Sequence, residues 1–224
     1  NDFVGSLLAF VIFQDLVSYR KQHIEHHRFL GKEQDPDLAF WNSVGLREMN
    51  KREFILKAIL YPILILPVFP LTVHLLKSRF ATTSNDRKKM FVVLWTCLIL
   101  CSLFLGNTLN ILIFWIVPYV TTFQIISWFS ELSEHYPLYY THSGDLLKMT
   151  RNKIGSRLEQ FIFGAHNDFL HLEHHLAPSI PFWNLHLSRS IHLKDSEYSS
   201  WESSNKSIFD LEGGCLREMI DFQK

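Results

Sequence analysis

Three short groups of histidine and acidic residues are the part of this sequence best suited to chemistry. They are His23-Ile24-Glu25-His26-His27, Glu131-Leu132-Ser133-Glu134-His135 and His171-Leu172-Glu173-His174-His175. In each group the polar side chains recur at positions i, i+3 and i+4, a spacing that places them on one face of a helix. Three such faces that meet would surround a metal ion with imidazoles.

The first and third groups repeat the same five-residue pattern, HxxHH, far apart in the chain. A single copy could be the solvated face of a helix. Only 12 of the 224 residues are histidine, however, so chance repetition of a pattern with three fixed histidines is improbable. No cysteine lies near these groups, and structural zinc sites commonly include thiolates. Imidazole ligands suit iron, copper or zinc, and the histidines in these groups exceed what one ion uses, so two ions are implied.

Long apolar runs mark the elements that must position these groups. The runs cover residues 3–14, 54–76, 91–105 and 109–129. Their clustering favours membrane helices over the spread periodicity of a soluble protein, although the first run is too short to span alone. The second contains Pro62, Pro67 and Pro70, which break helices, so we expect a re-entrant or in-plane segment. In the alternative topology, this segment spans and one later run lies in the interface.

The loop charges predict the topology. Basic residues gather in 18–53 and in 77–90, and the positive-inside rule places both loops in the cytoplasm. The runs 91–105 and 109–129 then cross twice and return the chain to that side. The sequence therefore predicts an all-α integral membrane protein with its histidine-rich site on the cytoplasmic face. Residues 1–195 form the predicted domain, and 196–224 are expected to be a polar, poorly ordered or loosely docked tail.

The composition excludes other classes of function. The 22 basic and 22 acidic residues cancel, so the chain lacks the basic surface that nucleic acid binding requires. Three scattered cysteines do not make a disulfide scaffold. The sequence has no Gly-rich dinucleotide fingerprint, so electrons for a redox reaction must come from an external donor. Among these metals, redox-active iron best explains a location in the membrane, because the bilayer supplies apolar substrates for oxidation.

The histidine groups and their flanks resemble those of a known family. The segment from Tyr19-Arg20-Lys21-Gln22-His23 to Gly31, followed by Asp35-Pro36-Asp37, resembles the second histidine box of the membrane fatty acid desaturases. Residues 167–181 resemble the third box, including its HHLxPxxP continuation, and Glu134-His135 resembles the isolated histidine after the last membrane run. The resemblance extends over roughly residues 1–195.

The resemblance implies a non-haem di-iron enzyme that uses O2 and external electrons to introduce a double bond into a fatty acyl or similar aliphatic chain. It assigns iron-ligand roles to His23, His26, His27, His135, His171, His174 and His175. It also places Asn167 opposite one of the two iron ions, through a water. The implied partners are the lipid bilayer, a fatty acyl-lipid or acyl-carrier substrate and a ferredoxin or cytochrome b5-like electron donor. The implied location is a bacterial inner membrane, with the histidine boxes cytoplasmic.

The family's first box, HxxxH, has no counterpart in this sequence. We therefore expect two further ligand histidines, four residues apart, upstream of Asn1, and we expect residues 1–224 alone to bind iron poorly and to lack desaturase activity. Two other functions stay open. One is a hydroxylase on the same scaffold, and the other is a membrane metal transporter. A transporter would place histidines inside the apolar runs, where only His74 lies.

Other polar residues carry smaller expectations. Hydrogen bonding to ligand histidines is a candidate role for His166 and His186. Exposure to solvent is expected for His142, His192 and Arg151. The residues Glu25 and Glu173 lie off the ligand face of their groups, where they either steady a histidine or face solvent. Asp35 and Asp37, on either side of Pro36, are expected to form a turn.

Overall fold

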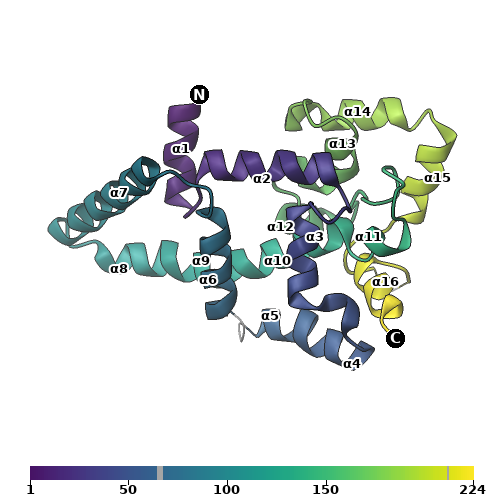
Figure 1. Ribbon diagram of the computed structural model, residues 1–224, viewed down its shortest axis with the longest axis horizontal. Helices are drawn as coiled ribbons and strands as arrows, with labels where there is room; N and C mark the ends of the chain where they lie inside the picture. Colours follow the sequence, from purple (N-terminus) through teal and green to yellow (C-terminus); the bar gives the residue numbers. More distant parts are fainter. Residues whose placement is uncertain (65–67, 211) are drawn as a thin grey trace. The chain divides into compact units, whose positions relative to one another are not determined.

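The computed structural model describes residues 1–64, 68–210 and 212–224, and within these residues it contains helices and no strands (Figure 1). The prediction of an all-α chain is confirmed. The chain divides into two compact units, residues 1–26 with 61–125 and residues 27–60 with 126–224. Pro67 lies outside the described residues, as do the side chains of Pro70 and His74.

The first unit is built from α1 (Asp2–Val11), the first part of α2 (Leu16–Phe29), α5 (Tyr61–Ile63) and α6 (Val68–Arg79). It continues with α7 (Asn85–Phe104), α8 (Thr108–Ile111), the π-helical turn η3 (Leu112–Ile116), α9 (Val117–Val120) and the start of α10 (Thr122–His135). The expected break within 54–76 is present, because α5 ends at Ile63 and α6 begins at Val68.

Asp15 joins the start of α2 to the start of α7. Its carboxylate is fully buried and accepts a hydrogen bond from the backbone N–H of Ser18 at 3.0 Å, which caps the first turn of α2. The same carboxylate accepts from Thr83 Oγ1 at 3.1 Å and from Arg87 Nε at 2.6 Å. The basic segment 77–90 therefore places one of its charges in a buried ion pair.

We expect Asp15→Ala to lower the free energy of unfolding by about 3–5 kcal/mol, because it leaves the Arg87 guanidinium without its buried partner. Chemical denaturation of the detergent-solubilised protein would measure the change. Asp86→Ala is the matched control, because this carboxylate is 90% exposed and pairs with Lys89 at 3.5 Å. Equal stability of the two variants would contradict a structural role for Asp15.

Within the described residues, one continuous helical stretch, Thr108–Thr141, is long and apolar enough to cross a membrane. Only 11% of the most apolar section of this stretch is buried, so most of its surface faces outward. α1 and α2 are long and apolar enough to span a membrane only if they are counted as one segment, and they are bent by 95° at their junction. The segment 91–105, expected to make a second crossing, lies in α7, which is not apolar enough over its length because its first turns carry Asp86, Arg87, Lys88 and Lys89.

The second unit begins with the end of α2, α3 (Pro36–Val44), the 3-10 turn η1 (Leu46–Glu48), α4 (Lys51–Phe54) and the π-helical turn η2 (Ile55–Leu60). Most of α10 follows, then α11 (Leu138–Thr141), α12 (Arg157–Phe163), the 3-10 segment η4 (Ala165–Leu170) and α13 (His171–Leu176). The chain ends with η5 (Phe182–Asn184), α14 (Leu185–His192), α15 (Ser196–Ser204) and α16 (Cys215–Phe222).

Aromatic side chains build the core of the second unit. The rings of Trp41 and Trp128 meet edge to face with centroids 5.4 Å apart, and Trp128 Nε1 donates to the carbonyl of Ala58 at 2.8 Å. The hydroxyl of the buried Tyr136 donates to the carbonyl of Leu46 at 3.2 Å. These contacts hold α10 against the segment that runs from α3 to η2. The end of α10 is thereby fixed within this unit.

The segment after residue 195, expected to be poorly ordered or loosely docked, forms two helices within the residues that the structure describes. Asp195 caps α15 by accepting from the backbone N–H of Tyr198 at 2.9 Å, and Tyr198 is buried together with Glu202. α16 buries Cys215 and Met219, which lie four residues apart on one face. The abundant serines of this region do not predict helices from composition alone, although α15 and α16 both form.

Candidate metal centre

α10 ends with a buried histidine whose ring orientation is set by the backbone. His135 is 2% exposed, and its Nδ1 lies 3.0 Å from the carbonyl oxygen of Met149. A carbonyl only accepts, so Nδ1 carries the proton and Nε2 keeps its lone pair. The ring stacks on that of Tyr139 at a centroid distance of 4.8 Å. Nε2 is therefore the nitrogen that His135 offers to a ligand.

The first turns of α13 bring two more imidazoles to the same place. His171 and His175 lie four residues apart, and their Nε2 atoms are 3.0 Å from each other. The Nε2 of His171 is also 3.1 Å from that of His135. Burial lowers the pKa of His171 to about 3, so this ring is neutral and can act as a ligand.

A second pair of imidazoles lies beside this trio. The Nε2 atoms of His27, near the end of α2, and His174 are 2.9 Å apart. The ring of His27 also packs on that of His175 with centroids 4.3 Å apart. The second unit thus brings five of the predicted ligands together, from α2, α10 and α13.

These distances fit a bound metal ion. Two ligand atoms about 2.1 Å from one ion, at angles between about 90° and 109°, are roughly 3.0–3.4 Å apart. The Nε2 separations of 3.0 and 3.1 Å around His171 fall in that range. Neutral imidazoles are ligands for iron, copper and zinc alike, so the donor set accommodates iron without selecting it.

His23 and His26 lie in the first unit, on the turn of α2 that precedes His27. The two rings have their centroids 6.1 Å apart, and Tyr19 stacks on His23 at 5.4 Å. His26 is 2% exposed, whereas His23 is half-buried. The helical register predicted from the HxxHH spacing is present, and the ligand role of both residues stays a prediction.

Asn167 lies in η4 with a left-handed backbone conformation, and its amide nitrogen donates to the carbonyl of Phe182 at 3.0 Å. The predicted water-mediated contact of Asn167 with a metal stays a prediction. His166 and His186 are both exposed and contact aromatic rings, those of Phe182 and Phe169. Their surroundings do not favour the suggested role of steadying ligand histidines.

A buried lysine network beside His171 was not anticipated from the sequence. The side chain of Lys153 is 1% exposed, and its ammonium group donates to Glu134 Oε1 at 2.5 Å and to Asp168 Oδ2 at 3.2 Å. It also donates to Ser130 Oγ at 2.8 Å. Burial lowers the pKa of Lys153, but the two carboxylates outweigh burial and raise it above its usual value. The lysine is therefore charged.

The surroundings of three polar residues correct or refine the expectations from the sequence: exposure of Arg151 is wrong, Glu173 is buried beside a histidine, and His192 is 32% exposed. Glu173 is fully buried and accepts hydrogen bonds from His192 Nδ1, at 2.6 Å, and from the hydroxyl of Tyr198. His192 is thus held by a carboxylate. Arg151 is 1% exposed, donates to the carbonyl of Tyr136 at 2.9 Å and pairs with Glu218 on α16. Buried charges need partners, and here each partner comes from an element distant in the sequence. Asp35 and Asp37, expected in a turn, instead begin a helix: the buried Asp35 caps α3 by accepting from the backbone N–H of Asp37 at 2.9 Å.

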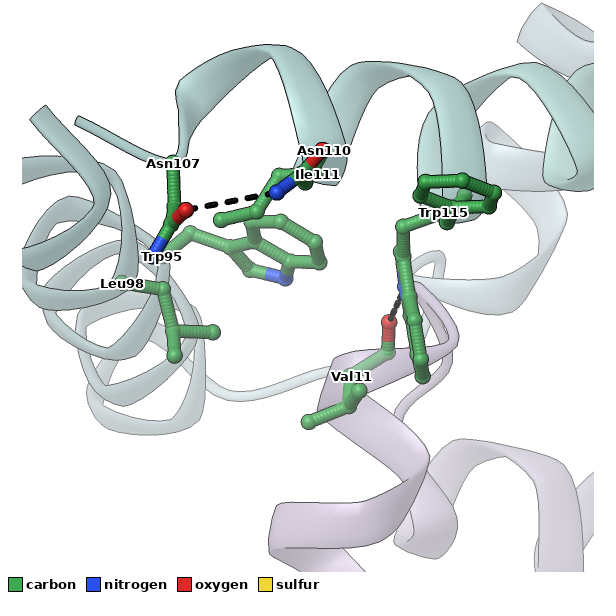
Figure 2. Close-up of a pocket in the computed structure, with 8 residues that line it drawn as sticks. Val11, Trp95, Leu98, Asn107, Asn110, Ile111 and Trp115 are labelled. Carbon is green, nitrogen blue, oxygen red and sulfur yellow. Dashed lines mark hydrogen bonds between the residues drawn. The ribbon is translucent and has the colours of Figure 1, made fainter. Parts of the chain in front are cut away.

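The first unit contains an apolar pocket of about 490 Å³. Its walls are formed by α7, α8 and η3, with Trp95, Leu98, Ile111 and Phe114 among the lining residues. Figure 2 shows the two carboxamides of the pocket, Asn107 and Asn110, joined by a hydrogen bond of 3.2 Å. It also shows Trp115 Nε1 donating to the carbonyl of Val11 at 3.0 Å. The pocket is uncharged and suits an aliphatic ligand.

Comparison with known proteins identifies the family. Residues 1–202 match the fatty acid desaturase family. The dihydrorhizobitoxine desaturase of Bradyrhizobium elkanii is 35% identical over 222 residues, which cover 93% of this chain and 63% of the relative. The chain thus spans less than two thirds of that relative's length. No solved structure matches it. Both matches indicate a desaturase-like oxidoreductase, and the chain belongs to the fatty acid desaturase family.

Proposed function

We propose that this protein is a membrane-bound non-haem di-iron desaturase that uses O2 and external electrons to introduce a double bond into an aliphatic chain. The observation that supports the proposal most directly is the convergence of the Nε2 atoms of His135, His171 and His175 in a member of this family. The pair formed by His27 and His174 supplies donors for a second ion. Bound there, iron would supply the redox chemistry with O2 that removes two hydrogens from the chain.

The residues of this chain would hold the metal and keep its ligands in the correct protonation state. The carbonyl of Met149 fixes the tautomer of His135, which directs Nε2 toward His171. Burial keeps His171 neutral, so no proton competes for its lone pair at ordinary pH. A ferredoxin or a cytochrome b5-like protein is proposed as the electron donor. The proposed location is a bacterial inner membrane, with the histidine groups on its cytoplasmic face.

The pocket chemistry suggests one class of substrate, and the name of the relative suggests a second compound. A fatty acyl chain, on a lipid or an acyl carrier, matches the uncharged walls of the pocket in the first unit. The name of the relative specifies dihydrorhizobitoxine, which is therefore the second compound to test. A hydroxylase on the same scaffold is the alternative reaction, since it differs only in what happens after hydrogen removal.

Product analysis tests the proposal. The full-length protein is expressed in a bacterial membrane with a ferredoxin and its reductase, and is supplied with fatty acyl substrates or dihydrorhizobitoxine under O2. Mass spectrometry should detect a product that has lost two hydrogens. A product that has gained one oxygen would support the hydroxylase instead. Failure to convert either substrate, with iron bound and electrons supplied, would contradict both reactions.

A further inference from the structure

A carboxylate lies next to the three converging imidazoles. Glu134 immediately precedes His135 at the end of α10, and its side chain is 10% exposed. Its Oε2 is 3.4 Å from the Nε2 of His171. The potential ligand atoms of Glu134, His135 and His171 all lie within 4.8 Å of one another. The distance between Oε2 and Nε2 therefore lies, like those between the imidazoles, in the range expected for two ligands of one ion.

Hydrogen bonds to one oxygen fix the orientation of the Glu134 carboxylate. Its other oxygen, Oε1, accepts from Lys153 Nζ at 2.5 Å and from Ser130 Oγ at 3.3 Å. Ser130 in turn contacts Lys153 and Asp168, so both groups that hold Oε1 are themselves held. With Oε1 engaged in this way, Oε2 is the oxygen that Glu134 presents to His171.

Hydrogen bonds alone do not account for the contacts of His171. Its Nε2 has three neighbours within 3.4 Å, namely Nε2 of His175, Nε2 of His135 and Oε2 of Glu134. A neutral imidazole nitrogen either donates one hydrogen bond or accepts one, so it cannot satisfy three neighbours. A cation shared by all four atoms satisfies each of them, because every one then directs a lone pair at the ion.

We propose that Glu134 is a carboxylate ligand of the metal ion held by His135, His171 and His175, and that Lys153 is the positioning residue that holds this carboxylate. The inference rests on the proposed function, since it concerns the same metal centre. It adds an anionic ligand to a set that the sequence predicts to consist of histidines and one asparagine. With neutral imidazoles and one carboxylate, a divalent ion keeps a single net positive charge at the site.

Titration of the metal-free full chain with Co2+ in detergent tests the inference, with visible absorption as the readout. Glu134→Gln keeps the size of the side chain but removes the anionic ligand. We expect it to raise the Co2+ dissociation constant about 100-fold and to shift the absorption bands. The control is Glu131→Gln, an exposed carboxylate on the same helix, which should leave both unchanged.

Two further variants separate ligation from folding. Lys153→Met should weaken Co2+ binding about 10-fold, because Glu134 loses its anchor. The double variant Glu134→Gln/Lys153→Met removes both buried charges together, so it should fold well. If Lys153 acts only through Glu134, the double variant binds Co2+ no more weakly than Glu134→Gln.

Each outcome bears on the inference. Wild-type affinity and an unchanged spectrum in Glu134→Gln would overturn it, and so would a Co2+ affinity of the double variant near that of the wild type. A full-length wild-type protein that binds no Co2+ would overturn both this inference and the proposed function. Co2+ binding that depends on Glu134, in a protein that desaturates neither substrate, would overturn the proposed function alone.

Discussion

Replacement of His171 by alanine is expected to abolish turnover and to weaken metal binding by about 100-fold or more. His171 is the central imidazole of the site, since its Nε2 lies 3.0 and 3.1 Å from those of His175 and His135. The variant lacks the imidazole that contacts both His135 and His175, so a bound ion would lose the ligand at the centre of the cluster. Iron content after loading and product formation by mass spectrometry would measure the two effects.

His142→Ala is the matched control for this variant. His142 follows α11, contacts the hydroxyl of Thr141 at 2.9 Å and lies outside the imidazole cluster. The control should keep full iron content and activity. The metal-free His171→Ala protein should still unfold cooperatively, because α13 keeps the buried Leu172 and Glu173. Full activity in His171→Ala would remove this residue from the ligand set.

Replacement of Lys153 by methionine is expected to lower the free energy of unfolding of the metal-free protein by about 3–5 kcal/mol. The lysine side chain is 1% exposed, and it neutralises the carboxylates of Glu134 and Asp168. Methionine fills a similar volume but leaves the buried Glu134 without a cation. Chemical denaturation in the presence of a chelator would isolate this effect from metal binding.

Lys148→Met is the matched control, because Lys148 also pairs with two carboxylates, those of Asp145 and Glu197, both at 3.0 Å. Its partners are 39% and 68% exposed, so water solvates them when the lysine is lost and stability should change little. Adding Glu134→Gln to Lys153→Met should recover part of the lost stability. Equal losses of unfolding free energy in Lys148→Met and Lys153→Met would show that burial of the Lys153 ion pairs does not contribute to stability.

Sequence patterns predicted the parts of the site that depend on local geometry. The HxxHH spacing requires only helical periodicity, and α2 and α13 present their histidines in that register. His135 was placed by its position after the last apolar run, and it ends α10. The proline-broken segment was expected from the fixed backbone of proline, and α5 does end at Ile63.

The tertiary structure decided which charged residues are buried and what they do there. Arg151 meets Glu218 across 67 positions of sequence, and Lys153 meets Glu134 across 19. Periodicity assigns a residue to a face of its own helix, but a buried charge is stable only if another element supplies a partner. Because that partner is set by chain packing, the sequence predicts Arg151 at the surface and gives no indication that Lys153 is buried. The sequence by itself thus determined the helices that carry the histidines and the faces on which they lie. Packing alone decided that Lys153 stands beside Glu134 and holds its carboxylate.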